Sequence, residues 1–189
     1  MELLGLVGLK PQLAARYPHE LSGGERQRLS IARALVLEPA LLIADEPVSM
    51  LDVSIRAGIL NLLKQQSREF GLTILYVSHD LSTTRYLCDR IAIMYRGRFV
   101  ELGEAERVID DAHHPYAQAL KAAIPIPDPE LDRPRSEAGD DPDEPPRESA
   151  GCRYAGTCPK AMEVCRRQAP ELRPVDAGHR VACFLYHPA

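Results

Sequence analysis

The sequence predicts an α/β fold with a largely parallel sheet. Residues 41–45 and 72–78 are short apolar runs of strand length, rich in leucine, isoleucine and valine. Segments with apolar residues at helical spacing lie before, between and after them. Strands that alternate with helices in this way favour a parallel sheet covered on both faces.

The first two helices are indicated by their apolar faces. One follows Ser22 and ends before Pro39, and its apolar face consists of Leu29, Ala32, Leu35 and Val36. The other follows Asp52, its expected N-cap, and carries Ile55, Ile59, Leu62 and Leu63. Serine and aspartate are favoured at N-caps because their side-chain oxygens accept hydrogen bonds from free backbone N–H groups.

Three further elements are expected after the second strand. Residues 80–88 suit a short helix. Residues 91–95 and 99–102 read as strands joined through Arg-Gly-Arg at residues 96–98, which is a hairpin signal. The α/β region is therefore expected to extend to about residue 123.

Composition excludes several classes of protein. In the 189 residues, 45% are hydrophobic and the net charge is −4. No apolar run approaches the roughly 18 residues of a membrane span, and the N-terminus has no secretory signal. Residues 128–148 carry nine acidic and three basic residues, which leaves a net charge of about +2 for the rest of the chain. We therefore expect a cytosolic protein without a nucleic-acid surface.

Three zones divide the chain. Residues 1–123 form the expected α/β region, and residues 124–150 a proline-rich acidic linker. Residues 151–189 form a small appendage with four of the five cysteines, Cys152, Cys158, Cys165 and Cys183. In a cytosolic chain such crowding favours a metal centre over disulfides. The fifth cysteine, Cys88, is expected to be a packing residue.

Polar residues end both predicted parallel strands. Asp45 and Glu46 follow the first strand and His79 follows the second, and ligands of open α/β sheets bind at the carboxyl ends of strands. Asp45 is suited to hold Mg²⁺, Glu46 to polarise an attacking water, and His79 to donate to a γ-phosphate. The alternative is a simple strand-exit turn followed by a helix cap.

A glycine-containing segment opens the first helix. Residues 21–25 read Leu-Ser-Gly-Gly-Glu. Glycines allow close backbone approach to a phosphate, and a helix N-terminus is electropositive. The candidate nucleotide-binding residues are therefore Ser22, Gly23, Gly24 and Glu25. Taken alone, the segment would be an ordinary helix start.

These residues together resemble the nucleotide-binding subunits of ABC transporters. Residues 21–25 look like the signature motif, residues 41–46 like Walker B with its catalytic glutamate, and residues 49–52, ending in Asp52, like the D-loop. His79 matches the switch histidine. The resemblance covers residues 1–123, and Glu25 stands where many members have glutamine.

The Walker A loop is not found in this sequence, which contains no Gly-x-x-x-x-Gly-Lys-Ser/Thr. In the family, two subunits enclose two ATP molecules head to tail, and the signature of one contacts the γ-phosphate held by Walker A of the other. The resemblance thus implies a partial P-loop NTPase-type domain, present as a fragment. We expect no ATPase activity from the isolated chain.

The C-terminal third resembles the ATP-binding subunits of oligopeptide and dipeptide importers. His-Pro-Tyr at residues 114–116 carries this resemblance, and the cysteines follow at spacings C-x5-C-x6-C-x17-C. In this subgroup the corresponding tail binds a cluster, [4Fe–4S] in some members. The spacing itself leaves an Fe–S cluster, a loose zinc site or disulfides open. His179 is a further possible ligand, although a lone histidine is more often hydrogen-bonded.

The expected function is an ATP-binding and ATP-hydrolysing energy-coupling subunit of a peptide importer. It would use ATP and Mg²⁺, pair with a second ATP-binding subunit, and attach to transmembrane permease subunits on the inner face of the cell membrane. The alternatives are a catalytically inactive regulatory or assembly module with a metal-cluster tail, a nickel or sugar importer subunit, and a soluble ABC ATPase of repair or translation.

Overall fold

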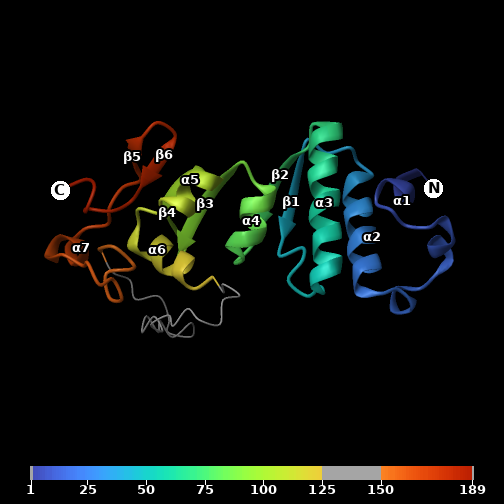
Figure 1. Ribbon diagram of the computed structural model, residues 1–189, viewed down its shortest axis with the longest axis horizontal. Coiled ribbons are helices and arrows are strands. Elements are labelled where there is room, and N and C mark those ends of the chain that lie inside the picture. The colour runs from blue at the N-terminus through green and yellow to red at the C-terminus, as the bar shows by residue number, and fades with distance from the viewer. Residues whose placement is uncertain (1, 125–149, 189) are drawn as a thin grey trace. The chain divides into compact units, whose positions relative to one another are not determined.

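The computed structural model describes residues 2–124 and 150–188 (Figure 1). The chain divides into two compact units, Met1–Leu87 and Cys88–Ala189, which we call the N-terminal and C-terminal units. Most of the predicted linker, residues 125–149, lies outside the described residues. Within the described part, no helix has both the length and the apolar character needed to cross a bilayer.

The N-terminal unit is a helical layer on a two-stranded parallel sheet. In chain order its elements are α1 (Glu2–Leu6), the 3-10 turns η1 (Pro11–Ala15) and η2 (Pro18–Glu20), α2 (Gly23–Leu35), β1 (Leu41–Asp45), α3 (Val53–Phe70), β2 (Thr73–Val77) and α4 (Leu81–Leu87). β1 pairs with β2 from Leu41↔Thr73 to Asp45↔Val77. The predicted helices and parallel strands of this region are confirmed.

Helix ends in this unit follow the local sequence. Ser22 caps α2, since its hydroxyl accepts from the Glu25 backbone N–H at 3.3 Å while the Glu25 carboxylate accepts from the Ser22 N–H at 2.8 Å. α3 ends at Phe70 and is followed by the C-cap residue Gly71, whose φ of 62° is left-handed. Asp52 occupies the N-cap position of α3, but its side chain makes no capping hydrogen bond.

The core of the N-terminal unit lies on one face of its sheet. α3 contributes Ile59, Leu60, Leu62 and Leu63, and α2 contributes Ile31 and Ala32; α3 lies between β1 and α2 (Figure 1). The opposite face presents Leu41, Ile43, Leu75 and Val77, which are 44–63% exposed. The prediction of strands covered on both faces is therefore not met within the described N-terminal unit, because its own elements cover one face of the sheet.

The C-terminal unit is built on an antiparallel sheet. Its elements are β3 (Arg90–Tyr95), β4 (Arg98–Glu104), α5 (Ala105–Asp110), α6 (Pro115–Ala122), α7 (Glu163–Arg167), β5 (Arg173–Asp176) and β6 (His179–Val181). The strand order is β3-β4-β6-β5. The predicted hairpin is confirmed, and its loop residues Arg96 and Gly97 have φ values of 45° and 77°, as a tight two-residue turn requires.

The cysteine-bearing tail packs within this unit. β6 pairs with β4 through Glu101↔Val181 and Leu102↔Arg180. Tyr154, which is 3% exposed, packs against Tyr95 of β3 in an edge-to-face contact with ring centroids 5.2 Å apart. The tail therefore shares one sheet and one hydrophobic core with the segment from β3 to α6, and Cys88 packs against the same core.

Candidate functional site

The two parallel strands of the N-terminal unit bring Glu46 and His79 together. Glu46 directly follows β1 and His79 lies two residues beyond β2. The Glu46 Oε1 atom lies 2.8 Å from His79 Nδ1 and accepts a hydrogen bond from the His79 backbone N–H at 3.1 Å. The His79 side chain is 79% exposed and that of Glu46 is 37% exposed. The acid and the imidazole therefore meet at an open edge, within reach of a ligand.

The backbone at Glu46 is strained. Its φ of 44° lies in the left-handed region, which is unfavourable for a residue with a side chain. The surrounding contacts hold this conformation, since the Glu46 N–H donates to the Val77 carbonyl at 2.9 Å and Ser49 Oγ donates to the Glu46 carbonyl at 3.1 Å. Such outliers concentrate at functional sites, where the surrounding structure fixes the position of the side chain.

The loop that carries His79 is fixed by its neighbour Asp80. The Asp80 carboxylate accepts from the backbone N–H groups of Ser82 and Thr83 at the start of α4. It also forms an ion pair with Arg56 of α3 at 3.4 Å. Both side chains are about 30% exposed, so the pair is partly shielded from solvent. The Asp80 contacts thus anchor the loop while the His79 ring stays accessible.

The glycine segment has a packing role that the sequence did not reveal. A Cβ on Gly24 would lie 2.6 Å from Ile55 Cγ2, so α2 and α3 approach too closely there for a side chain. Gly23 has more room, with Leu51 Cδ2 at 3.6 Å. The hydrogen bond from the Ser22 backbone holds the pKa of the Glu25 carboxyl below its usual value. Glu25 is thus the ionised partner of a helix cap.

The other predicted nucleotide-binding residues are Asp45 and Asp52. Asp45 is the exposed last residue of β1, and Asp52 is exposed immediately before α3. Among the hydrogen bonds and ion pairs found in the described ranges, none joins residues 22–25 to Glu46 or His79. Among the described residues, hydrogen bonds therefore join two pairs of predicted site residues, Glu46 with His79 and Ser22 with Glu25.

The four tail cysteines line one small cavity in the C-terminal unit. The cavity has a volume of about 20 Å³, and its walls also include His114, Pro115 and Tyr154. All four cysteines are free thiols, Cys165 and Cys183 buried and Cys152 and Cys158 half-buried. Burial raises the pKa of the thiols of Cys152, Cys158 and Cys183, and the neighbouring cysteines raise it further. A bound cation would reverse this effect by stabilising thiolates.

The donor set fits a thiolate-bound metal centre. Thiolates around one zinc ion at 2.3 Å lie about 3.8 Å from one another. Across the described ranges, the group of three ligand atoms found within 4.8 Å of one another is Glu101, His113 and His179, without any cysteine.

His114 is the buried polar residue of this cavity wall. It caps α6, since its Nδ1 accepts from the Tyr116 backbone N–H at 3.0 Å. Burial lowers the pKa of its imidazole to about 4. His114 is therefore neutral, with its remaining ring proton on Nε2.

A second polar cluster was missed by the sequence reasoning. Glu101 of β4 is fully buried and lies 2.8 Å from His179, which is 1% exposed. His179, a further possible metal ligand from the sequence, is instead hydrogen-bonded to a carboxylate. The available signal was an acidic residue inside a predicted strand, where a charged side chain is rarely buried without a partner.

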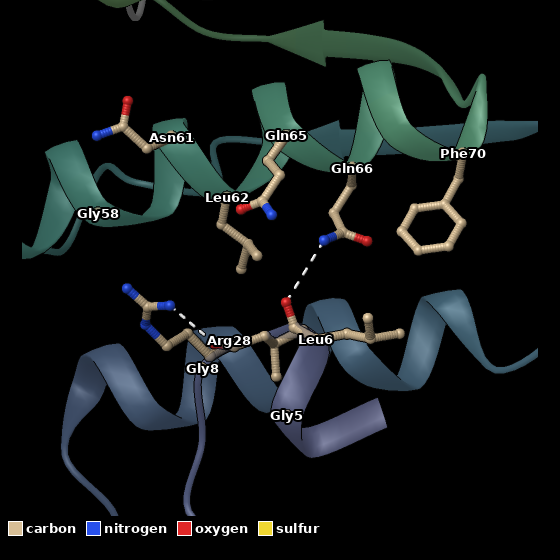
Figure 2. Close-up of a pocket in the computed structure, with 11 residues that line it drawn as sticks. Gly5, Leu6, Gly8, Arg28, Gly58, Asn61, Leu62, Gln65, Gln66 and Phe70 are labelled. Atoms are coloured by element: carbon tan, nitrogen blue, oxygen red, sulfur yellow. Dashed lines mark hydrogen bonds between the residues drawn. The ribbon is translucent and has the colours of Figure 1, made fainter. Parts of the chain in front are cut away.

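One cavity of the N-terminal unit contains none of the predicted site residues. It measures about 690 Å³ and lies between the turn after α1, α2 and α3 (Figure 2). Arg28 donates to the Val7 carbonyl at 2.7 Å, and Gln66 Nε2 donates to the Leu6 carbonyl at 3.4 Å. The buried Gln66 Oε1 has no protein partner among the described residues, and a water in this open cavity would satisfy it.

Two family models match the chain. Residues 1–49 match the model described as ABC transporter. Residues 100–165 match the model described as oligopeptide/dipeptide transporter, C-terminal region. The first match includes the glycine segment and Glu46, and the second includes Glu101, His114 and three of the cysteines.

Curated relatives match nearly the whole chain. A putative oligopeptide transport ATP-binding protein of Bacillus subtilis, YkfD, is 47% identical over 100% of this chain and 58% of its own length. The oligopeptide transport ATP-binding protein OppF of Haemophilus influenzae is 47% identical over 94% of this chain and 54% of its own length. The chain thus spans somewhat more than half the length of these relatives.

Solved structures support part of an ABC ATP-binding fold. cbiO1 from Clostridium perfringens, part of the ABC transporter complex cbiONQ, is 34% identical with a TM-score of 0.54, over 58% of this chain and 43% of the other. A putative metal-chelate type ABC transporter gives 30% identity and a TM-score of 0.54, over 57% and 42%. Together with the sequence relatives, these similarities show that the chain belongs to the oligopeptide/dipeptide group of ABC transporter ATP-binding proteins.

Proposed function

We propose that this chain is the ATP-hydrolysing, energy-coupling part of a peptide importer. The observation that carries the proposal is the contact of Glu46 with His79 at the carboxyl ends of two parallel strands. The names of the curated relatives, which describe oligopeptide transport ATP-binding proteins, support peptides as the transported class. No comparison favours a nickel or sugar importer.

In this proposal Glu46 orients the attacking water through its carboxylate. His79 exchanges a hydrogen bond with the γ-phosphate and so senses its presence. Its hydrogen bond to Glu46 holds it near the carboxyl ends of the strands. Asp45 would hold Mg²⁺, which supplies positive charge to neutralise the phosphate oxygens. The strained backbone at Glu46 fixes its carboxylate before the substrate binds.

The remaining parts of the site require a partner. Ser22, Gly23, Gly24 and Glu25, at the N-terminus of α2, would face a γ-phosphate held by a second ATP-binding subunit. Asp52 would lie at the junction of the two subunits. Permease subunits in the membrane would receive the motion, so the protein would act on the inner face of the cell membrane.

The test is ATP turnover of the 189-residue chain mixed with a separately expressed upstream half of a relative that carries a Walker A loop. We expect turnover in the mixture and none from the chain alone. Glu46→Gln should lower the rate by about 100-fold or more, because general-base assistance contributes 10²- to 10⁴-fold. Glu69→Gln, an exposed change in α3, is the matched control.

Two outcomes would contradict the proposal. Turnover by the mixture that is unchanged in Glu46→Gln would remove Glu46 from the reaction. A mixture that assembles and binds ATP without hydrolysing it would favour the regulatory or assembly module.

We further propose that Cys152, Cys158, Cys165 and Cys183 bind an Fe–S cluster. Four free thiols around one cavity support this proposal. When bound, the cluster would crosslink the two tail segments that supply its ligands. Chain purified without oxygen should contain iron and sulfide in equal amounts and absorb visible light, and Cys165→Ser should lose both. Colourless protein with one zinc per chain would identify the zinc alternative.

A further inference from the structure

The C-terminal unit contains a buried acidic side chain that the proposed function does not use. Glu101 of β4 is 0% exposed. Its Oε1 accepts from the His113 backbone N–H at 2.8 Å and lies 2.8 Å from His179 Nε2. Its Oε2 accepts from the His114 backbone N–H at 2.7 Å. Three donors thus converge on one carboxylate, as burial of a charge demands.

These donors come from two separate segments. His113 and His114 immediately precede α6, and His179 begins β6. His179 is the one ion-pair partner of Glu101 found among the described residues. Gly103 of the same strand makes room for the imidazole, because a Cβ there would lie 3.3 Å from His179 Cδ2. The Glu101 carboxylate therefore joins the segment before α6 to the tail.

A metal ion is a weaker interpretation of this cluster. The ligand atoms of Glu101, His113 and His179 lie within 4.8 Å of one another. However, Oε1 already has two donors and Oε2 has one. The 2.8 Å separation of His179 Nε2 from Oε1 is that of a charge-assisted hydrogen bond. A metal would have to replace the proton of that bond.

Both segments tied by Glu101 lead to the four-cysteine cavity. His114 and Pro115 form part of its wall. Cys183 follows His179 by four residues, and Ala182 between them donates to the Val100 carbonyl at 2.8 Å. Cys183 therefore reaches the cavity at the end of β6.

The other three cysteines are held by a different set of contacts. The Cys152 N–H donates to the Cys165 carbonyl at 2.8 Å, and the Cys158 N–H donates to the Tyr154 carbonyl at 2.9 Å. These bonds lie within residues 152–165 and do not involve Glu101. The cavity is thus assembled from one self-contained segment and one cysteine delivered by β6.

We propose that Glu101 is the positioning residue of the four-cysteine cavity. Its carboxylate holds β6 and the segment before α6 so that Cys183 faces Cys152, Cys158 and Cys165. The consequence for metal binding rests on the proposed Fe–S centre, whereas the placement of Cys183 does not. Loss of the carboxylate therefore frees Cys183 selectively.

The test measures N-ethylmaleimide labelling of each cysteine by mass spectrometry in the metal-free 189-residue chain. Glu101→Gln retains the side-chain shape, but its NH₂ group must face one of the three donors. We expect the labelling rate of Cys183 to rise about tenfold or more, while that of Cys165 changes less than about twofold. Glu104→Gln, an exposed change at the end of the same strand, should leave both rates unchanged.

A second variant decides the result if Glu101→Gln exposes all four thiols through unfolding. His179→Gln leaves the bonds of Glu101 to His113 and His114 in place and should free Cys183 with Cys165 still protected. Equal labelling of Cys183 in wild type and both variants would overturn the proposal, as would equal exposure of Cys165 and Cys183 in His179→Gln.

Iron content separates this inference from the proposed function. If wild type binds the cluster, Glu101→Gln should lose its visible absorption, and Glu101→Asp, which retains the charge, should recover part of it. If wild type binds no iron but Cys183 is still freed selectively, the positioning role stands and the Fe–S centre fails.

Discussion

The two polar sites of this molecule are built in opposite ways. Glu46 and His79 meet at an exposed edge, held by a side-chain contact, a backbone hydrogen bond and a strained turn. Glu101 and His179 meet in the interior, where every carboxylate oxygen has a donor. In our proposals the exposed pair serves a ligand that enters and leaves, whereas the buried pair positions two segments of the chain. A short distance between a glutamate and a histidine therefore does not by itself distinguish a ligand-binding pair from a structural pair, whereas the exposure of the two side chains does.

The largest loss of stability is expected at Gly151, where two parts of the tail pack closely together. A Cβ on Gly151 would lie 2.3 Å from the Cys165 carbonyl oxygen and 2.7 Å from the backbone of Arg166. Because backbone cannot move aside like a flexible side chain, Gly151→Ala should lower the free energy of unfolding of the C-terminal unit by roughly 3 kcal/mol. Hydrogen exchange of peptides from residues 90–124 and 150–188 measures it.

Gly156→Ala is the matched control, because a Cβ at Gly156 would meet no atom within 4 Å. Equal protection of the two variants would show that the tail is looser than its contacts indicate, and the contrast with the exposed site would weaken.

A loss of stability of similar size is expected when the pH falls, because of His114. The folded-state pKa of about 4 lies below the ordinary value of 6.5, so the unfolded chain binds the proton more readily. The stabilisation is complete above pH 6.5 and is lost as the pH falls toward 4, by about 3 kcal/mol in total. Urea unfolding at several pH values should show this slope.

His114→Asn isolates that contribution. Asparagine can still cap α6 but does not titrate, so the difference between the two proteins between pH 6.5 and 4 should equal the His114 contribution. A variant with the same slope as wild type would show that other groups govern the acid sensitivity of the C-terminal unit.

A smaller effect is expected at the glycine segment. Gly24→Ala places a methyl group 2.6 Å from Ile55 Cγ2, and this flexible side chain can shift. Overpacking of about 1–3 kcal/mol is partly offset by about 1 kcal/mol of helix propensity. We expect a net loss of about 1 kcal/mol in thermal or urea unfolding of the N-terminal unit. Gly5→Ala in α1, with open space around it, should not destabilise.

The smallest effect is expected on the open face of the parallel sheet. Ile43 is 63% exposed, so Ile43→Thr should change the free energy of unfolding by less than about 0.5 kcal/mol. It should reduce self-association measured by light scattering, because the apolar face draws copies together. A loss above about 1 kcal/mol would show that this face is covered in solution.

The sequence was most informative where short-range rules apply. The strand ends predicted the meeting of Glu46 and His79 because parallel strands place their carboxyl ends at one edge. The sequence was least informative where interacting residues lie far apart along the chain, or where packing determines which residue is present. Gly24 was predicted as a phosphate contact, and its close packing against Ile55, an additional reason for glycine there, could not be read from the sequence. The pairing of Glu101 with His179 spans 78 positions and has no local signature. The open sheet face depends on what else packs there, which an apolar run does not reveal.

The position of β6 between β4 and β5 has a consequence for synthesis on the ribosome. An inner strand of the sheet is made after the hairpin it joins, so this sheet cannot close until residue 181 has left the exit tunnel. The earlier hairpin must wait with one hydrogen-bonding edge open, and such long-range closure is slow. The late arrival of Cys183 also means that the nascent chain cannot assemble all four thiols around the cavity before residue 183 has left the exit tunnel.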